Sequence, residues 1–221
     1  CVIDHDGTVD KFIGDALMAF WNAPLDVKDH REKAIHCGRK MFHLLAKLNN
    51  EVMDEGLEEL KIGVGINTGD VVVGNMGSDQ RFDYTCLGDA VNLSSRLEGQ
   101  TKEYRVGIIV GEETTKGIEE RFNFVELDKI AVKGKKEGVR IFTILDDTSR
   151  CANGGDVKHH DTFLSFYRKQ HWNRALKMID LNQITYPELK GYYEMMRERI
   201  ETLKINRPGK GWDTIYRATS K

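Results

Sequence analysis

The order of hydrophobic and polar positions predicts short strands and helices in alternation over most of the chain. β-favouring runs at residues 8–13 and 16–21 flank Gly14 and Asp15, a dipeptide that suits a tight turn, so these runs are expected to form a hairpin. Over residues 29–56 the apolar positions follow the helical period instead. We therefore expect a long amphipathic helix after the first hairpin.

A second, glycine-rich hairpin is predicted from residues 62–66 and 71–73, and residues 74–83 are expected to form a loop. A short strand at 84–87 then leads into a helix over 89–104. Further strands are expected at 107–110, 122–127 and 139–145, with a helical turn near 112–119. The pattern predicts the α+β class, in which helices cover one side of a largely antiparallel sheet.

The chain is expected to divide into three parts. Residues 1–147 carry the mixed pattern, whereas residues 148–160 have no periodicity and contain Gly154 and Gly155, so they are expected to form a linker. Residues 161–221 are expected to be helical, and they resemble one and a half helix-turn-helix repeats of the tetratricopeptide (TPR) kind. Because so short an array cannot bury its apolar face alone, we expect this TPR-like tail to need a neighbour on which to dock.

Composition excludes several classes of protein. With 40% hydrophobic and 31% charged residues the chain falls among ordinary globular proteins, and its net charge of -2 gives no positive field for binding nucleic acid. No apolar run approaches the roughly 20 residues that a membrane helix needs. The 4 cysteines form no Cys-x-x-Cys pair, which favours reduced thiols. We therefore expect a cytoplasmic segment without direct membrane contact.

Asp15, at the tip of the first predicted hairpin, is a candidate metal ligand, and Lys11 precedes it in the incoming strand. Aspartate is a common turn residue, so Asp15 alone indicates little. A carboxylate at the edge of a sheet is nevertheless the hard oxygen ligand that Mg²⁺ prefers, and such an ion would in turn hold triphosphate oxygens.

Asn92 and Arg96 form a second candidate pair, because residues four positions apart share one face of a helix. Leu93 and Leu97 share the adjoining face, which is expected to be buried. The alternative is a solvated helix face on which Arg96 pairs with a nearby acid. Lys133 also has two interpretations, a solvated basic turn or a clamp for phosphate.

Three longer segments carry more specific information than these pairs. They read VDKFIGDALMAFW, GVGINTGDVVVGNMGSDQRFDYTCLGDAVNLSSRLEG and VKGK. From about residue 7 to residue 145 the chain resembles the class III nucleotidyl cyclases, which include mammalian membrane adenylyl cyclases and many bacterial ones. The resemblance implies the ferredoxin-like cyclase fold, an α/β sandwich within the α+β class. It also implies attack of the ribose 3′-oxygen of a nucleoside triphosphate on the α-phosphorus, with pyrophosphate leaving.

The resemblance assigns a role to each candidate residue. Asp15 matches the second of two metal-binding aspartates, and two Mg²⁺ or Mn²⁺ ions are expected per site. Lys11 matches the lysine that contacts the purine, and Thr85 matches the second purine-selecting residue, which is threonine in a bacterial subgroup. This pair suits adenine, so ATP is favoured over GTP. The remaining residues match positions that orient the ribose (Asn92), stabilise the transition state (Arg96) and hold the terminal phosphates (Lys133).

The resemblance also implies a head-to-tail homodimer, in which the metal-binding aspartates come from one copy and Asn92 and Arg96 from the other. The first metal-binding aspartate would precede Cys1, so we expect the chain to be a truncated part of a longer adenylate cyclase and to be inactive alone. An upstream sensor is expected in that protein, and an anchor in the bacterial inner membrane is compatible with it. The alternatives are a guanylate cyclase and a non-catalytic cyclase-homology domain that regulates or dimerises.

Overall fold

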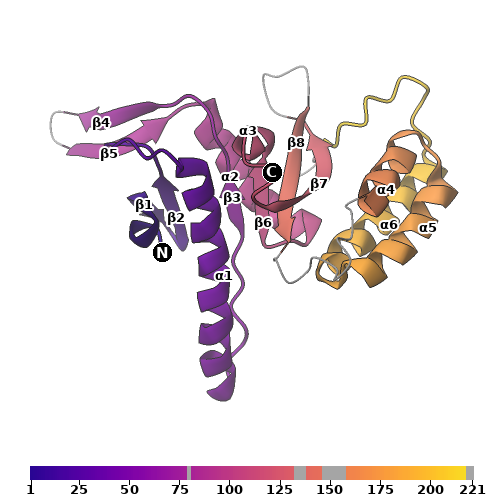
Figure 1. The fold of residues 1–221 in the computed structure, drawn as a ribbon, viewed down its shortest axis with the longest axis horizontal. Coiled ribbons are helices and arrows are strands. Elements are labelled where there is room, and N and C mark those ends of the chain that lie inside the picture. The colour runs from indigo at the N-terminus through magenta and orange to yellow at the C-terminus, as the bar shows by residue number, and fades with distance from the viewer. Residues whose placement is uncertain (79–80, 132–137, 146–157, 218–221) are drawn as a thin grey trace.

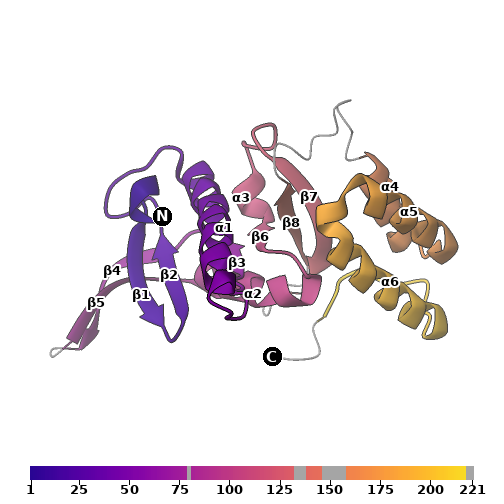
Figure 2. The same cartoon turned by 90° about the horizontal axis from the view of Figure 1, so that it is seen from below.

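A computed structural model describes the chain except for residues 79–80, 132–137, 146–157 and 218–221. A four-stranded sheet lies at the centre, two β-hairpins lie on one side of it, and a group of helices packs on the other (Figure 1). The long helix α1 (His30–Asp54) lies between the first hairpin and the central sheet, as both views show (Figure 2). The expected α+β class with C-terminal helices is confirmed.

The first hairpin forms as predicted. β1 (Thr8–Ile13) pairs antiparallel with β2 (Ala16–Phe20), after a short 3-10 helix, η1 (Ile3–His5). Gly14 has a φ of 65°, a left-handed value that glycine adopts without steric cost. The turn therefore places Asp15 at the tip of the hairpin.

The central sheet has the strand order β3 (Val64–Ile66), β6 (Ile108–Gly111), β8 (Val139–Leu145), β7 (Asn123–Ile130). β3 runs parallel to β6, whereas β8 is antiparallel to both of its neighbours. β6 is buried along its whole length, and the short helix α3 (Glu112–Thr115) follows it. Ile35 of α1 belongs to the same hydrophobic cluster as residues of β3 and β6, so α1 packs on this end of the sheet.

The predicted second hairpin is wrong. Residues 64–66 pair with β6, and the next strand, β4 (Val72–Ser78), pairs with β5 (Arg81–Leu87). Residues 74–83, expected to be a loop, therefore lie mainly in these two strands, which form an arm (Figure 1). Glycine and small polar residues along β4 interrupt the hydrophobic alternation that marks a strand, so its pattern resembles that of a loop.

α2 (Asp89–Tyr104) has the bounds that the sequence predicts. It lies so close to β3 that a Cβ on Gly65 would come within 2.3 Å of backbone atoms of Ser94 and Glu98. At the same contact the Ser94 hydroxyl donates a 2.9 Å hydrogen bond to the Gly65 carbonyl. β3 thereby fixes the position of α2 over the sheet.

The C-terminal helices are α4 (Lys158–Arg168), α5 (Trp172–Thr185), η3 (Pro187–Leu189) and α6 (Lys190–Ile205). α4 begins inside the range 148–160 expected to be a linker, and the rest of that range lies outside the described residues. The buried side chains of these helices join those of the sheet in one hydrophobic cluster, which includes Leu97, Leu127 and Tyr193. The tail is therefore docked on the sheet. Among the described helices none is long and apolar enough to cross a membrane.

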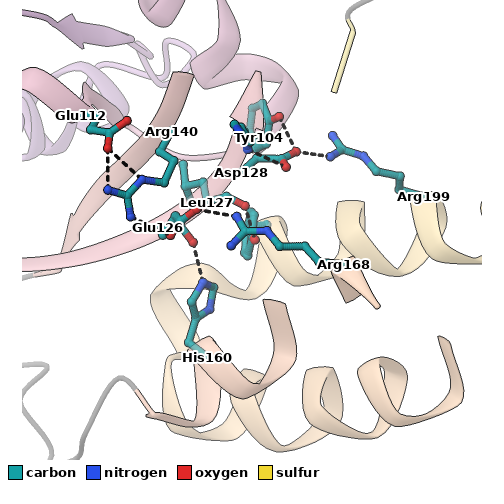
Figure 3. Close-up of polar contacts among 11 residues, drawn as sticks. Tyr104, Glu112, Glu126, Leu127, Asp128, Arg140, His160, Arg168 and Arg199 are labelled. Carbon is teal, nitrogen blue, oxygen red and sulfur yellow. Dashed lines mark hydrogen bonds and ion pairs between the residues drawn. The ribbon is translucent and has the colours of Figure 1, made fainter. Parts of the chain in front are cut away.

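Polar contacts reinforce this docking on the side of β7 (Figure 3). Asp128 of β7 accepts hydrogen bonds from Tyr104 at 2.7 Å and from Arg199 of α6 at 2.5 Å. Arg168 of α4 forms an ion pair with Glu126 of β7. Because these contacts use charged groups that are largely withdrawn from water, they fix the register of the helices on the strand.

Candidate active site

Two hairpins bring Lys11 and Thr85 together, Lys11 from β1 and Thr85 from β5. Thr85 Oγ1 donates a 2.5 Å hydrogen bond to Asp10 Oδ2, and Lys11 Nζ lies 3.4 Å from Asp10 Oδ1. Lys11 Nζ also lies 3.6 Å from Asp83 Oδ2 of β5. Thr85 is buried, whereas the Lys11 side chain is 36% exposed, so its ammonium group is accessible to a ligand.

Asp10 and Asp83 are contacts of this pair that the sequence pattern does not identify. In a regular strand Asp10 and Lys11 would point to opposite faces. The register of β1 against β2 shifts between Val9 and Lys11, and this β-bulge lets both side chains reach residues of β5. The Asp10 side chain is fully buried there, and its Oδ1 accepts no hydrogen bond within the described part of the chain.

Asp15 is exposed in the turn between β1 and β2, and its carboxylate has no hydrogen bond or ion pair to any described residue. A free carboxylate of this kind fits one oxygen ligand of a Mg²⁺ ion. It does not make a complete site, since the described ranges contain no group of three or more His, Cys, Asp or Glu residues that could hold a metal ion. Other ligands would have to come from a nucleotide, water or further protein groups.

Asn92 and Arg96 lie on the exposed face of α2, while Leu93 and Leu97 are buried as predicted. Neither Asn92 nor Arg96 forms a hydrogen bond or an ion pair through its side chain with the residues described here. The alternative in which Arg96 pairs with a nearby acid is therefore not observed in this part of the chain. Lys133, the predicted phosphate ligand, lies outside the described residues.

Large apolar side chains on the two hairpins that carry Lys11 and Thr85 are exposed to solvent. Five of them on the first hairpin and the β4–β5 arm are each more than half exposed: Phe12, Ile13, Val72, Phe82 and Leu87. Exposed apolar groups in such number on neighbouring strands are typical of a surface that another protein covers.

Residues 4–146 match the family model of the adenylate and guanylate cyclase catalytic domain. The match covers more than half of the chain, so the chain belongs to this family, and the α+β part of the fold is a nucleotidyl cyclase domain.

Curated relatives include several adenylate cyclases. Adenylate cyclase 1 of Rhizobium meliloti (strain 1021) is 34% identical over 144 residues, which are 65% of this chain and 22% of that protein. An adenylate cyclase of Anabaena cylindrica is 37% identical over 145 residues, 62% of this chain and 28% of that protein. The terminal-differentiation specific adenylate cyclase of Dictyostelium discoideum is 29% identical over 214 residues, 92% of this chain and 10% of that protein. The chain thus spans less than a third of the length of these relatives.

Solved structures of both kinds of cyclase are similar to this one. The adenylyl cyclase CyaB from P. aeruginosa is 33% identical with a TM-score of 0.60, over 66% of this chain and 75% of that chain. The guanylyl cyclase Cya2 is 35% identical with a TM-score of 0.58, over 65% of this chain and 72% of that chain. Overall similarity therefore does not separate ATP from GTP as the substrate, and the local chemistry of the site has to do so.

Proposed function

We propose that this domain belongs to an adenylate cyclase, which converts ATP to 3′,5′-cyclic AMP and pyrophosphate for intracellular signalling. The observation that supports ATP most directly is the juxtaposition of Lys11 and Thr85 around one shared carboxylate, Asp10. On its Watson–Crick edge adenine presents an acceptor at N1 and a donor at its 6-amino group. An ammonium group donates to the first and a hydroxyl oxygen accepts from the second.

The segment from β5 into α2 would hold the rest of the nucleotide. Thr85 lies near the end of β5 and α2 begins directly after it, so Thr85, Asn92 and Arg96 of one copy act on the same nucleotide. The Asn92 amide orients the ribose. The guanidinium of Arg96 donates to phosphate oxygens and stabilises the charge that develops in the transition state. Lys133 is proposed to hold the terminal phosphates.

Asp15 is proposed to supply one ligand to the metal ions. Two bound Mg²⁺ or Mn²⁺ ions would supply activation of the ribose 3′-oxygen and neutralisation of the pyrophosphate leaving group. The exposed carboxylate of Asp15 is available for this role without loss of any contact between described residues.

A second copy of the chain is the proposed partner, bound head to tail. The exposed apolar residues of the β1–β2 hairpin and the β4–β5 arm provide a surface for that contact. Asp15 of one copy and Arg96 of the other would meet across it, and a symmetric dimer would contain two sites. The threonine-type subgroup, the truncation, the upstream sensor and the TPR-like character of the tail remain predictions.

The test is a cyclase assay of the intact protein with Mn²⁺ and either ATP or GTP, beside its Asp15→Ala and Lys11→Glu variants. We expect the wild type to prefer ATP. Asp15→Ala should lower turnover by about 100-fold or more, because the metal ions that neutralise charge in the transition state lose one of their ligands. Lys11→Glu should abolish the preference for ATP, since a carboxylate cannot donate to adenine N1.

Asp26→Ala is the matched control, because Asp26 is also an exposed acid near the first hairpin and has no role in the proposed site. It should leave turnover close to that of the wild type. ATP turnover that survives Asp15→Ala would show that the metal assignment is wrong, and a wild type that prefers GTP would contradict adenylate cyclase activity.

A further inference from the structure

We propose that Asp10 sets the base specificity of this site by holding the Thr85 hydroxyl with its proton turned away from the nucleotide. Asp10 is then a positioning residue that acts through Thr85. This role rests on the proposed function, because Thr85 and Lys11 are the groups proposed to contact the purine.

The hydrogen bond between Thr85 and Asp10 has only one possible direction. A carboxylate carries acceptor oxygens alone, so the Thr85 hydroxyl must donate, and the Oγ1–Oδ2 distance is 2.5 Å. The Asp10 side chain is fully buried and Thr85 is 7% exposed, so little water can compete for the proton. The lone pairs of Thr85 Oγ1 are what remains for a ligand, which makes the residue an acceptor.

An acceptor at this position separates adenine from guanine. The 6-amino group of adenine donates, so it can bond to Thr85 Oγ1. Guanine carries a carbonyl oxygen at the same ring position, and two acceptors would face each other without a proton between them. The neighbouring ring position, N1, also separates the two bases. The Lys11 ammonium group can donate to N1 of adenine, whereas N1 of guanine carries a proton, so two donors would face each other. A free threonine hydroxyl, by contrast, could rotate and donate to guanine.

The same carboxylate also acts on Lys11. Asp10 Oδ1 lies 3.4 Å from Lys11 Nζ and accepts no hydrogen bond within the described residues. One buried group thus holds both purine-reading side chains, Lys11 by charge and Thr85 by hydrogen bonding. The β-bulge at Asp10 is what permits this arrangement, because it allows consecutive residues of β1 to reach β5.

The test is Asp10→Asn in the intact protein, measured as the ratio of kcat/KM for ATP to kcat/KM for GTP. The asparagine amide can donate to Thr85 Oγ1, which frees the hydroxyl proton for a ligand. We expect this ratio to fall by about tenfold or more, through a loss for ATP together with a gain for GTP.

Thr85→Val and the double variant Asp10→Asn/Thr85→Val separate positioning from general damage. Valine keeps the shape of threonine without the hydroxyl, so the ATP:GTP ratio should not change further when Asp10→Asn is added to it. Asp26→Asn is the matched control, because it neutralises an exposed carboxylate near the first hairpin that has no role in the proposed site and leaves the bond between Asp10 and Thr85 in place. Its ratio should stay close to that of the wild type.

Competition of ATP and GTP for a bound fluorescent ATP analogue gives the ratio of their dissociation constants, which should fall in the same direction and does not depend on the catalytic step. If Asp10→Asn lowers kcat/KM equally for both nucleotides, or if its effect adds fully to that of Thr85→Val, Asp10 has only a structural role and the proposal is overturned. A wild type that neither binds nor converts either nucleotide overturns the proposed function, and the role of Asp10 with it.

Discussion

His160 is a titratable side chain that the C-terminal helices hold away from water. Its Nε2 lies 2.6 Å from the Glu126 carbonyl oxygen (Figure 3). Its Nδ1 lies 2.8 Å from the Tyr193 hydroxyl. Because a carbonyl can only accept, Nε2 carries the proton, and Nδ1 accepts from Tyr193. Burial, with a smaller contribution from the nearby Arg168 charge, lowers the pKa of His160 to about 4, against the opposing effect of the Glu126 carbonyl.

This lowered pKa predicts a loss of stability in mild acid. Between pH 6.5 and pH 4 the unfolded imidazole binds a proton that the folded one does not, so the contribution of His160 is fully present above pH 6.5 and decreases below it. The decrease should approach about 1.4 kcal/mol for each pH unit, or roughly 3 kcal/mol by pH 4. Urea unfolding at pH 7 and at pH 4.5 measures it, by comparison with His160→Gln, which cannot titrate.

His159→Gln is the matched control for this measurement. His159 is the neighbouring residue on α4 and is exposed, so its removal should leave the pH dependence of the wild type unchanged. If the free energy of unfolding of His160→Gln decreases as steeply as that of the wild type when the pH is lowered from 7 to 4.5, His160 is not the source of the pH dependence.

The residues of the candidate site differ in how far the sequence could identify them. Lys11, Thr85 and Asn92 lie in segments whose sequence resembles that of the class III nucleotidyl cyclases, so the sequence alone is enough to propose them as site residues. Asp10 stands in the same segments, yet strand alternation places its side chain on the face opposite Lys11. Only the β-bulge brings Asp10 to Thr85, and a bulge in this strand has no distinct sequence pattern.

At the level of elements, the packing of α2 on β3 determines where Asn92 and Arg96 lie. Gly65 permits this packing, because backbone atoms of α2 occupy the space that a Cβ would need. Gly65→Ala should therefore displace α2, lower the free energy of unfolding by about 1–3 kcal/mol, and reduce cyclase turnover by more than the stability loss explains. Chemical unfolding and the ATP assay of the intact protein measure the two effects.

Gly99→Ala provides the control within α2 itself. A Cβ on Gly99 would meet no atom within 4 Å, and alanine favours the helix, so this variant should gain about 0.5–1 kcal/mol of stability. If Gly65→Ala behaves like Gly99→Ala, β3 does not fix the position of α2.

Elements formed by local contacts could be predicted from the sequence, whereas pairings between distant segments could not. The β1–β2 hairpin and α2 have nearly the bounds expected, because a turn or a helical period specifies each of them. β3 was expected to pair with the next strand, but it pairs in parallel with β6, which lies beyond α2. Parallel pairing needs a crossover connection, and short apolar runs do not indicate which strand lies at the far end of it.

For the whole molecule, the C-terminal helices are packed against the cyclase domain. They share a hydrophobic cluster, and near the C-terminus Tyr216 exchanges backbone hydrogen bonds with Lys129 and Ala131 along the edge of the sheet. Arg105, at the end of α2, has a φ of 54°, the left-handed conformation that glycine usually supplies, and its guanidinium forms a 2.9 Å ion pair with Glu198 of α6. The tail thus contacts the helix that carries the proposed catalytic residues.

Arg199→Ala tests whether this interface contributes to global stability. Arg199 is 12% exposed and Asp128 only 2%, so removal of the arginine leaves a buried carboxylate with an incomplete set of partners. We expect a loss of about 3–5 kcal/mol in the free energy of unfolding. Arg197→Ala on the same helix is the control: its ion pair with Asp180 is exposed, and its loss should cost less than about 1 kcal/mol.

The shape of the unfolding transition distinguishes one folded body from two. Of the three tryptophans, Trp172 and Trp212 lie among the C-terminal helices and the segment after them, and Trp21 packs near α1. In a Trp21→Phe background tryptophan fluorescence therefore reports on the tail, whereas circular dichroism reports on the entire chain. If tail and sheet fold cooperatively, both probes should shift together in Arg199→Ala and keep a single transition. A variant in which tryptophan fluorescence changes at a lower temperature than circular dichroism, with the main transition unmoved, would show that the helices fold independently and only rest on the sheet.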